Sequence, residues 1–283
     1  MAPSRTPALT DSLISDFLTD ACQIILSGRN GEKPMFYCCA VTEQGVKERN
    51  EDAVLIDNTV LTEGMLESEV YKPFIAAVCD GVSGEKSGDI ASKMCLAELA
   101  KQEYSSQVNL TNEINRIHKQ LQRYGAFHKN SSNMQTTICG FAVDENLKMC
   151  YINVGDSRLY RFRDSKLKQL TKDQSLVEML YEQGKIGYEE KRNHVHRNII
   201  MPVLGNTTAH PNIDVNIIRD APEHGDVFLI CSDGLSDYVV KSEIEEILSM
   251  PMPMTRRLEE MVRRSLNKGC RDNISVVAAT YMP

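Results

Sequence analysis

The residues Phe74-Ile75-Ala76-Ala77-Val78-Cys79-Asp80-Gly81 form a short apolar run that ends in an aspartate and a glycine. The same arrangement returns at Tyr151–Asp156 and at Phe228–Gly234, and a further aspartate, Asp272, precedes the apolar run Ile274–Ala278. One Asp-Gly pair by itself indicates a turn, because aspartate bonds its own backbone and glycine allows a positive φ. Four aspartates beside apolar runs indicate strand ends that bring carboxylates together.

Working outward, apolar runs of strand length come in groups and do not alternate one by one with helices, which predicts an α+β layered domain. We expect residues 58–70 and 185–200 to be loops, the latter after a helical start at 172. A helical extension is expected over 1–31, because apolar residues have helical spacing in 8–28, and one domain over 32–283. The expected strands are Met35–Val41, Ala53–Ile56, Phe74–Cys79, Thr137–Val143, Lys148–Val154, Arg158–Phe162, Val227–Cys231 and Ile274–Tyr281, and the expected helices are 88–103, 111–124, 241–249 and 254–268.

The composition excludes several classes of protein. The 283 residues are 42% hydrophobic and 25% charged, with a formal net charge of −7, and no basic stripe suggests nucleic-acid binding. No apolar run approaches the roughly 20 residues that span a bilayer, and the first residues do not resemble a secretory signal. Nine scattered cysteines without a C-x-x-C pair suggest reduced thiols. We therefore expect a soluble, cytoplasmic protein.

The clustered aspartates predict a metal site. Carboxylates brought together repel one another unless a positive charge lies between them. All-oxygen ligation suits hard cations such as Mg²⁺ or Mn²⁺, and two such ions can activate a water and clamp a phosphoryl group. Glu51 and Asp52, just before the strand that starts at Ala53, add two more carboxylates.

Taken together, six short motifs resemble the metal-dependent protein phosphatases, the type 2C serine/threonine phosphatases, and most closely their bacterial-type members. The resemblance covers about residues 36–281, and a segment at about 172–205 resembles the family's flap. Each motif alone is weak evidence for the family, but six motifs in the right order are strong evidence. The motifs are Gly45–Ala53, Val78–Gly81, Thr136-Thr137, Asn153–Arg158, Cys231–Asp237 and Arg271–Ser275, and the flap carries Gln174–Val177, Arg197-Asn198 and Val203–Gly205.

This resemblance implies a four-layer α/β/β/α sandwich with two central antiparallel sheets flanked by helices. It also implies a centre of two Mg²⁺ or Mn²⁺ ions. Asp80 would bridge both ions, the Gly81 carbonyl would bind the second, and Asp233 and Asp272 would bind the first. The activity implied is hydrolysis of phosphoserine and phosphothreonine in protein substrates, with a counterpart Ser/Thr kinase, and no nucleic-acid or membrane partner.

Further roles follow from the same resemblance. Asp52, with Glu51, would bind waters on the metals, and Asp156 together with Asp233 would form a weaker third site. The catalytic residues are then Lys47, Asp52 and Asp80. The family's phosphate-clamping arginine falls on Lys47, so we expect Lys47 to hold the substrate phosphate and to leave metal binding unaffected. Arg49 is the alternative clamp, because residues two apart in an extended segment point to the same side.

Other interpretations stay open. Val82 stands where some relatives carry a histidine, so that candidate general acid is missing. We expect Thr136-Thr137 to be ordinary strand sequence, and His194 and His196 suggest a mobile loop more than a zinc site. A non-catalytic phosphatase-like scaffold and a metal-dependent hydrolase of small phosphorylated molecules remain the alternative functions.

Overall fold

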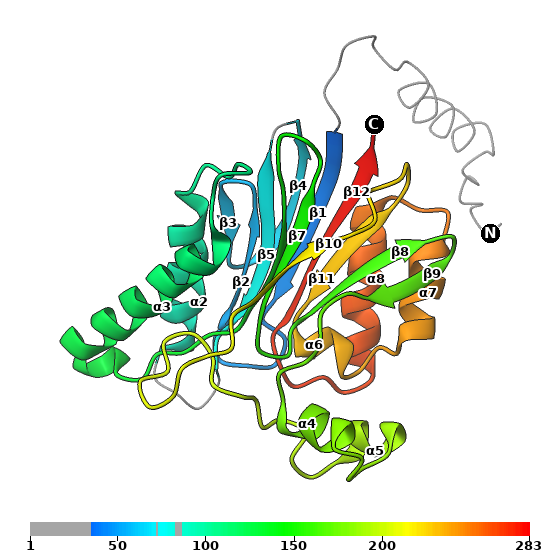
Figure 1. Ribbon diagram of the computed structural model, residues 1–283. Helices are drawn as coiled ribbons and strands as arrows, with labels where there is room; N and C mark the ends of the chain where they lie inside the picture. The colour runs from blue at the N-terminus through cyan, green and yellow to red at the C-terminus, as the bar shows by residue number, and fades with distance from the viewer. Residues whose placement is uncertain (1–34, 72, 83–86) are drawn as a thin grey trace, which may run out of the picture.

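The computed structural model describes residues 35–71, 73–82 and 87–283. The helix expected at 8–28, and with it the extension 1–31, lies outside the described residues. The described chain forms two six-stranded antiparallel sheets that pack face to face (Figure 1). The first sheet has the order β4 (Gly64–Val70), β1 (Met35–Glu43), β12 (Ile274–Met282), β11 (Val227–Cys231), β8 (Arg158–Arg163), β9 (Lys166–Gln169). The second has the order β10 (Asp214–Ile218), β7 (Met149–Val154), β6 (Ile138–Val143), β5 (Phe74–Asp80), β2 (Asp52–Ile56), β3 (Thr59–Leu61).

Helices cover the outer face of each sheet (Figure 1). The pair α2 (Gly88–Ala100) and α3 (Leu110–Phe127) packs on the second sheet, and the pair α7 (Lys241–Ser249) and α8 (Met254–Asn267) packs on the first. The predicted four-layer α/β/β/α sandwich is therefore confirmed. The short helices α4 (Leu176–Glu182), α5 (Tyr188–Asn193) and α6 (Asp233–Ser236) and the 3₁₀ turn Lys129–Ser131 complete the described elements.

Each outer helix is held by one apolar face. In α8 the buried residues include Leu258, Met261 and Val262, whose spacing of three to four places them on one side of the helix. In α3 the buried apolar residues are likewise spaced by three or four, and the Asn109 side chain caps the first turn by accepting from the Asn112 N–H at 3.0 Å. These faces explain why the helical periodicity of the sequence predicted these elements.

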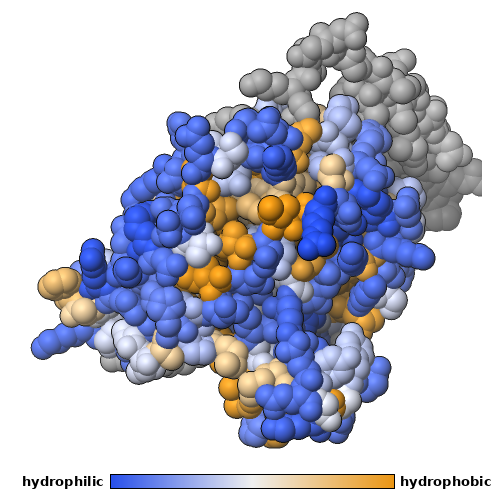
Figure 2. All heavy atoms as spheres, in the orientation of Figure 1, coloured by the Kyte–Doolittle hydropathy of each residue, from blue (hydrophilic) through white to orange (hydrophobic). Residues whose placement is uncertain are grey.

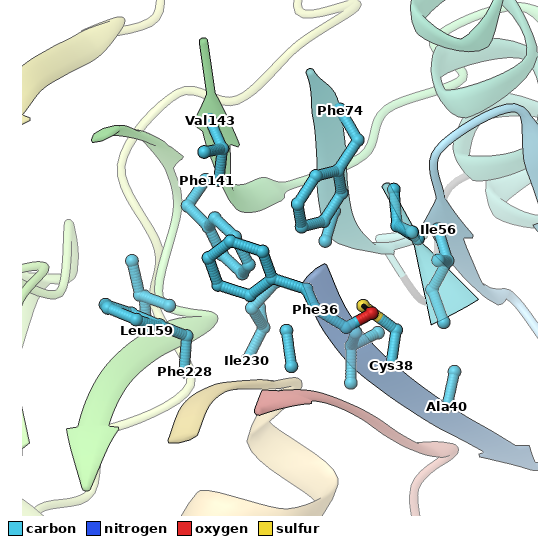
Figure 3. Packing of buried hydrophobic residues seen from close by; sticks show 14 of the residues in the cluster. Phe36, Cys38, Ala40, Ile56, Phe74, Phe141, Val143, Leu159, Phe228 and Ile230 are labelled. Atoms are coloured by element: carbon cyan, nitrogen blue, oxygen red, sulfur yellow. Dashed lines mark hydrogen bonds between the residues drawn. The ribbon is translucent and has the colours of Figure 1, made fainter. Parts of the chain in front are cut away.

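The core between the two sheets is built around aromatic rings (Figure 3). Alternate residues of a strand point to opposite faces of its sheet, so each strand sends every second side chain inward. The ring centroids of Phe36 and Phe74 are 5.2 Å apart, those of Phe74 and Phe141 are 5.7 Å apart, and those of Phe141 and Phe228 are 5.4 Å apart. This chain of contacts joins strands of both sheets into one core.

Two expectations about loops were wrong. Residues 58–70 form β3 and β4, and β4 is an edge strand that pairs with β1 along its whole length. Its outward side chains are mostly polar, so its strand character depends on backbone pairing with β1 and not on an apolar pattern. Within the expected loop 185–200, residues 188–193 form the short helix α5. The short strands β9 and β10, which the sequence did not predict, lie like β4 at the edges of the sheets.

Two further observations concern the surface. None of the helices in the described ranges has both the length and the apolar character that a bilayer crossing requires. The face in Figure 2 is mostly hydrophilic, with apolar side chains in its middle and at the edge of the projection that carries α4 and α5.

The aromatic core gives a prediction for stability. Phe141→Ala should lower the free energy of unfolding by about 3–5 kcal/mol, because it opens a cavity where the two sheets meet. The matched control Phe127→Ala, at the 85% exposed end of α3, should change it by less than about 0.5 kcal/mol. Urea unfolding followed by circular dichroism measures both, and equal effects would contradict this description of the core.

Candidate functional site

Asp80 and Asp52 lie side by side at one end of the second sheet. Asp80 is the last residue of β5, Asp52 is the first of β2, and the two are paired directly across these antiparallel strands. Asp52 is only 1% exposed, and its Oδ2 accepts a hydrogen bond from the Ser232 hydroxyl at 2.9 Å. Burial raises the pKa of Asp52 to about 7, even though hydrogen bonds from Ser275 and Ser232 oppose the shift.

Two threonines fix the backbone of Asp80. The Thr137 hydroxyl accepts from the Asp80 N–H at 3.0 Å, and the Thr137 N–H donates to the Asp80 carbonyl at 2.8 Å. The Thr136 hydroxyl donates to the same carbonyl at 2.9 Å. Thr136-Thr137 is thus more than ordinary strand sequence, because it sets the position from which the Asp80 carboxylate projects.

Asp233 and Asp272 reach the same end of the molecule from the first sheet. Asp233 follows β11 as the first residue of α6, and Asp272 lies just before β12. The two turns pack tightly, since a Cβ on Gly234 would lie 1.9 Å from the Asn273 carbonyl oxygen. The buried Oδ1 of Asp233 has no hydrogen-bond partner among the described residues. A buried carboxylate oxygen without a partner destabilises the folded protein, so we expect a cation or another partner to bind this atom.

Asp156 belongs to the turn between β7 and β8. Burial and then the charge of Asp173 raise the pKa of Asp156 to about 7, although Arg158 opposes the shift. Arg158 itself binds Asp173 through two nitrogens, with Nη2 to Oδ2 at 2.7 Å and Nε to Oδ1 at 3.0 Å. The Arg158 charge is therefore largely committed to Asp173 and leaves the Asp156 carboxylate in need of another positive charge.

We call the five aspartates that meet here the acidic centre. Burial, and then the charges of the other members, raise the pKa of both Asp80 and Asp233 well above the ordinary range. Crowded carboxylates with oxygen donors only are the ligands that Mg²⁺ and Mn²⁺ prefer. The members of the acidic centre are Asp52, Asp80, Asp156, Asp233 and Asp272.

The donor set and the unpartnered Asp233 oxygen fit a divalent cation. As the side chains stand, no group of three or more His, Cys, Asp or Glu residues in the described ranges is arranged to hold an ion. Among the candidate ligands, Asp272 is already in contact with a cation of the chain, since its Oδ1 lies 3.0 Å from the Lys47 ammonium.

Lys47 faces the acidic centre, whereas Arg49 is exposed to solvent. Partial burial lowers the pKa of Lys47, but its hydrogen bond to Asp272 and the charges of Asp272, Glu51 and Asp80 outweigh this and raise it. Of the two basic residues considered from the sequence, Lys47 is the one that the fold directs toward the aspartates.

One asparagine, whose role the sequence did not reveal, ties these loops together. Asn273 is 2% exposed, and its Nδ2 donates to the carbonyls of Gln44 at 2.8 Å and Arg49 at 3.0 Å. Its Oδ1 accepts from the Glu51 N–H at 2.9 Å, and its own N–H donates to Asp272 Oδ1 at 2.9 Å. Asn273 therefore positions the loop of Lys47 and Glu51 against the turn of Asp272. Only the Asp272-Asn273 motif could have pointed to it.

A second tie joins the acidic centre to the segment that carries α4 and α5, which we call the flap. The Gln174 side chain accepts from the Gly155 N–H at 3.1 Å and donates to the Asn153 carbonyl at 3.3 Å. The Gln174 N–H donates to the Gly155 carbonyl at 2.9 Å, and the Gln174 carbonyl accepts from Met201 at 2.8 Å. Both ends of the flap thus meet beside Asp156, at the end of the sandwich that carries α6 (Figure 1).

A cavity of about 1020 Å³ lies between the flap, the strands β8 and β9, and the helices α6 and α7. Its walls include Asp156 and Asp233 of the acidic centre and Ser175, Val177 and Tyr188 of the flap. None of the eight free cysteines in the described part of the chain lines it. The cavity thus offers carboxylates and no thiol nucleophile.

His194 and His196 lie on the flap, with ring centroids 5.5 Å apart, and belong to no metal-binding group within the described residues.

A two-sheet sandwich with aspartates crowded at one end defines a class of protein suited to chemistry at a metal centre. Comparison with known proteins gives the family, because residues 48–275 match the model described as "Protein phosphatase 2C". The chain belongs to the protein phosphatase 2C family, as the sequence motifs predicted.

Relatives and solved structures agree with this assignment. The serine/threonine phosphatase stp of Listeria welshimeri is 30% identical over 246 residues, which cover 83% of this chain and 92% of that protein. The crystal structure of serine/threonine phosphatase Stp1 from Staphylococcus aureus matches with a TM-score of 0.73 and 29% identity, covering 89% of this chain and 98% of that one. The catalytic domain of the phosphatase PstP, solved with two manganese ions, matches with a TM-score of 0.70 and 27% identity, covering 89% and 100%.

The unpartnered Asp233 oxygen gives a two-sided prediction. Asp233→Asn should raise the melting temperature of metal-free protein, because it removes a charge from a buried, mutually repelling group. The same substitution should abolish stabilisation by Mn²⁺, which in the unmodified protein should reach about 2.7 kcal/mol at 100 times the Kd. Differential scanning calorimetry with and without Mn²⁺ measures both effects.

The matched control is Asp164→Asn in the exposed β8–β9 turn, where the backbone has φ 50° and asparagine is well tolerated. This variant should keep the full response to Mn²⁺. Equal stabilisation of the Asp233→Asn protein by Mn²⁺ would show that Asp233 is not a ligand.

Proposed function

We propose that this chain is a metal-dependent protein serine/threonine phosphatase that hydrolyses phosphoserine and phosphothreonine with water as the nucleophile. The observation that carries the proposal is the acidic centre, two of whose members, Asp156 and Asp233, line the cavity beside the flap. Membership of the protein phosphatase 2C family supports the reaction, and relatives such as the Listeria stp protein are named serine/threonine phosphatases. Residues 32–283 would form the catalytic domain, with the flap over about 172–205.

The ligand roles that we propose are those that the motifs implied. Asp80, Asp233 and Asp272 would hold two Mg²⁺ or Mn²⁺ ions together with the Gly81 carbonyl, and Asp156 would share a weaker third ion with Asp233. When bound, such ions supply Lewis acidity that activates water and neutralises charge on the phosphoryl group. The fold supports Asp80 as the shared ligand, because the threonine hydrogen bonds fix its backbone between the other aspartates.

The other residues of the site orient the reactants. Asp52 and Glu51, held by Ser232 and Asn273, would accept hydrogen bonds from waters in the centre. Lys47 would contact the substrate phosphate from the loop between β1 and β2. The water oxygen forms the new P–O bond while the bond to the serine or threonine oxygen breaks. The attacking water gives up one proton, and the leaving oxygen takes one up and departs as the hydroxyl. No covalent phosphoenzyme is expected, because water attacks the phosphorus directly in a single displacement.

The flap favours a protein substrate over a small phosphorylated molecule. It exposes apolar side chains, of which Tyr188 also lines the cavity, and a surface of this kind can contact a polypeptide on either side of a phosphorylated residue. A counterpart Ser/Thr kinase would supply that phosphoprotein. The exposed side chains are Met179, Tyr181, Tyr188, Val195, Ile199 and Met201.

Metal dependence tests the proposal. Excess chelator should abolish turnover of a phosphothreonine peptide, and Mn²⁺ or Mg²⁺ should restore it. Asp80→Asn should reduce the rate by several orders of magnitude, because the bound ions provide both the activation of water and the charge neutralisation. Phosphate release is the measurement, and Asp164→Asn again serves as the control. Full activity in chelator would exclude the mechanism, and no turnover with either metal would favour the scaffold.

Turnover of a phosphopeptide panel against a panel of phosphorylated metabolites separates the two hydrolase functions. Preference for the metabolites would contradict the proposed substrate class.

Lys47 gives a second kinetic prediction. At saturating Mn²⁺, Lys47→Ala should raise KM roughly 10- to 150-fold, the range for loss of one charge-assisted hydrogen bond of about 1.5–3 kcal/mol. Arg49→Ala, two residues away and exposed, should leave KM nearly unchanged. The reverse result, with KM raised only by Arg49→Ala, would move the phosphate clamp to Arg49.

A further inference from the structure

The loop between β1 and β2 places one lysine directly on a candidate metal ligand. The Lys47 ammonium lies 3.0 Å from Asp272 Oδ1, and the two side chains are 27% and 38% exposed. The same oxygen accepts the Asn273 N–H at 2.9 Å. Lys47 therefore already supplies a positive charge to one of the carboxylates that would bind a metal ion.

The structure holds this lysine in place from both sides. Asn273 binds the carbonyls of Gln44 and Arg49, which flank Lys47, and the Lys47 carbonyl accepts from Gln44 Nε2 at 2.7 Å. Gly45 adopts φ 63°, and a Cβ there would lie 2.8 Å from the Asp272 carbonyl oxygen. The loop that presents Lys47 is thus pinned by its backbone against the Asp272 turn, and the ion pair follows from this packing.

We propose that Lys47 acts as an internal counter-cation of the metal-free acidic centre, which opposes metal binding at Asp272 and is released toward the substrate phosphate when metal binds. This inference rests on the metal centre of the proposed function and adds a coupling between metal loading and phosphate binding. Both cations use one carboxylate, so a divalent ion at Asp272 meets an ammonium group at short range. From the sequence alone Lys47 was expected to leave metal binding unaffected, and the ion pair changes that expectation.

The coupling should be moderate. Ion pairs between partly exposed groups are weak, while removing the ammonium also removes its repulsion of a divalent ion. We expect Lys47→Met to tighten Mn²⁺ binding roughly 2- to 20-fold at 0.15 M ionic strength. The matched control Arg49→Met removes a positive charge from the same loop, but it should change the affinity by less than about twofold, because exposed charges are screened.

Isothermal titration calorimetry of the full chain with Mn²⁺ tests this directly, without any measurement of activity. Lys47→Gln repeats the test with a polar side chain in case methionine disturbs the loop. Unchanged or weaker Mn²⁺ binding in both Lys47 variants, or an equal gain in Arg49→Met, would overturn the inference. No Mn²⁺ binding to any of the proteins would overturn it together with the metal centre. Intact Mn²⁺ binding without phosphatase activity would instead count only against the proposed function.

Inorganic phosphate provides the second readout. Phosphate offers the released ammonium a new partner, so it should tighten Mn²⁺ binding more in the unmodified protein than in Lys47→Met. Linkage requires that Mn²⁺ tighten phosphate binding by the same factor, which a phosphate titration checks. The same enhancement in both proteins would overturn the role of Lys47 in the coupling.

Discussion

Electrostatic repulsion among buried carboxylates is the constraint on which the rest of this structure depends. Asp80 and Asp52 are directly paired neighbours at the end of one sheet, and Asp233 and Asp272 reach the same place from the other. Such crowding destabilises the fold unless positive charge is added. Hydrogen bonds from neighbouring residues hold the backbone and side chains of these aspartates in place against this repulsion. The crowded carboxylates lower the stability of this part of the fold, and the same crowding is what allows the site to bind a cation.

The aromatic core shows where the stability to tolerate this comes from. Both sheets are locked together by the contacts among Phe36, Phe74, Phe141 and Phe228, and helices cover both outer faces. The acidic centre is built on the ends of these packed strands, because each of its aspartates lies at a strand end or within two residues of one. The flap, joined to this body beside Asp156, is the part best placed to vary with the substrate.

The sequence predicted those features that depend on residues close together in the chain. Apolar runs ending in Asp80, Asp156 and Asp233 identified both the strands and the acidic centre, because strand periodicity and the adjoining aspartate lie within a few residues. It did not predict β4, whose strand character depends on pairing with β1, nor the short edge strands. The hydrogen bonds of Asn273 and Gln174 were also beyond prediction. Asn273 joins residues more than 220 positions apart, and no local pattern encodes such a contact.

The contact of Lys47 with Asp272 differs in kind from the one that an arginine would make. Within the described chain, both donors that reach this carboxylate, Lys47 and the Asn273 N–H, use Oδ1. An ammonium is a compact point charge that can share one oxygen, whereas a guanidinium is a planar fork suited to two oxygens at once. The arginine that the family carries at this position is suited to gripping two phosphate oxygens, whereas Lys47 makes one compact contact with Asp272 Oδ1. A single contact between partly exposed groups is weak, so Lys47 can steady the acidic centre and still give way when a metal ion binds.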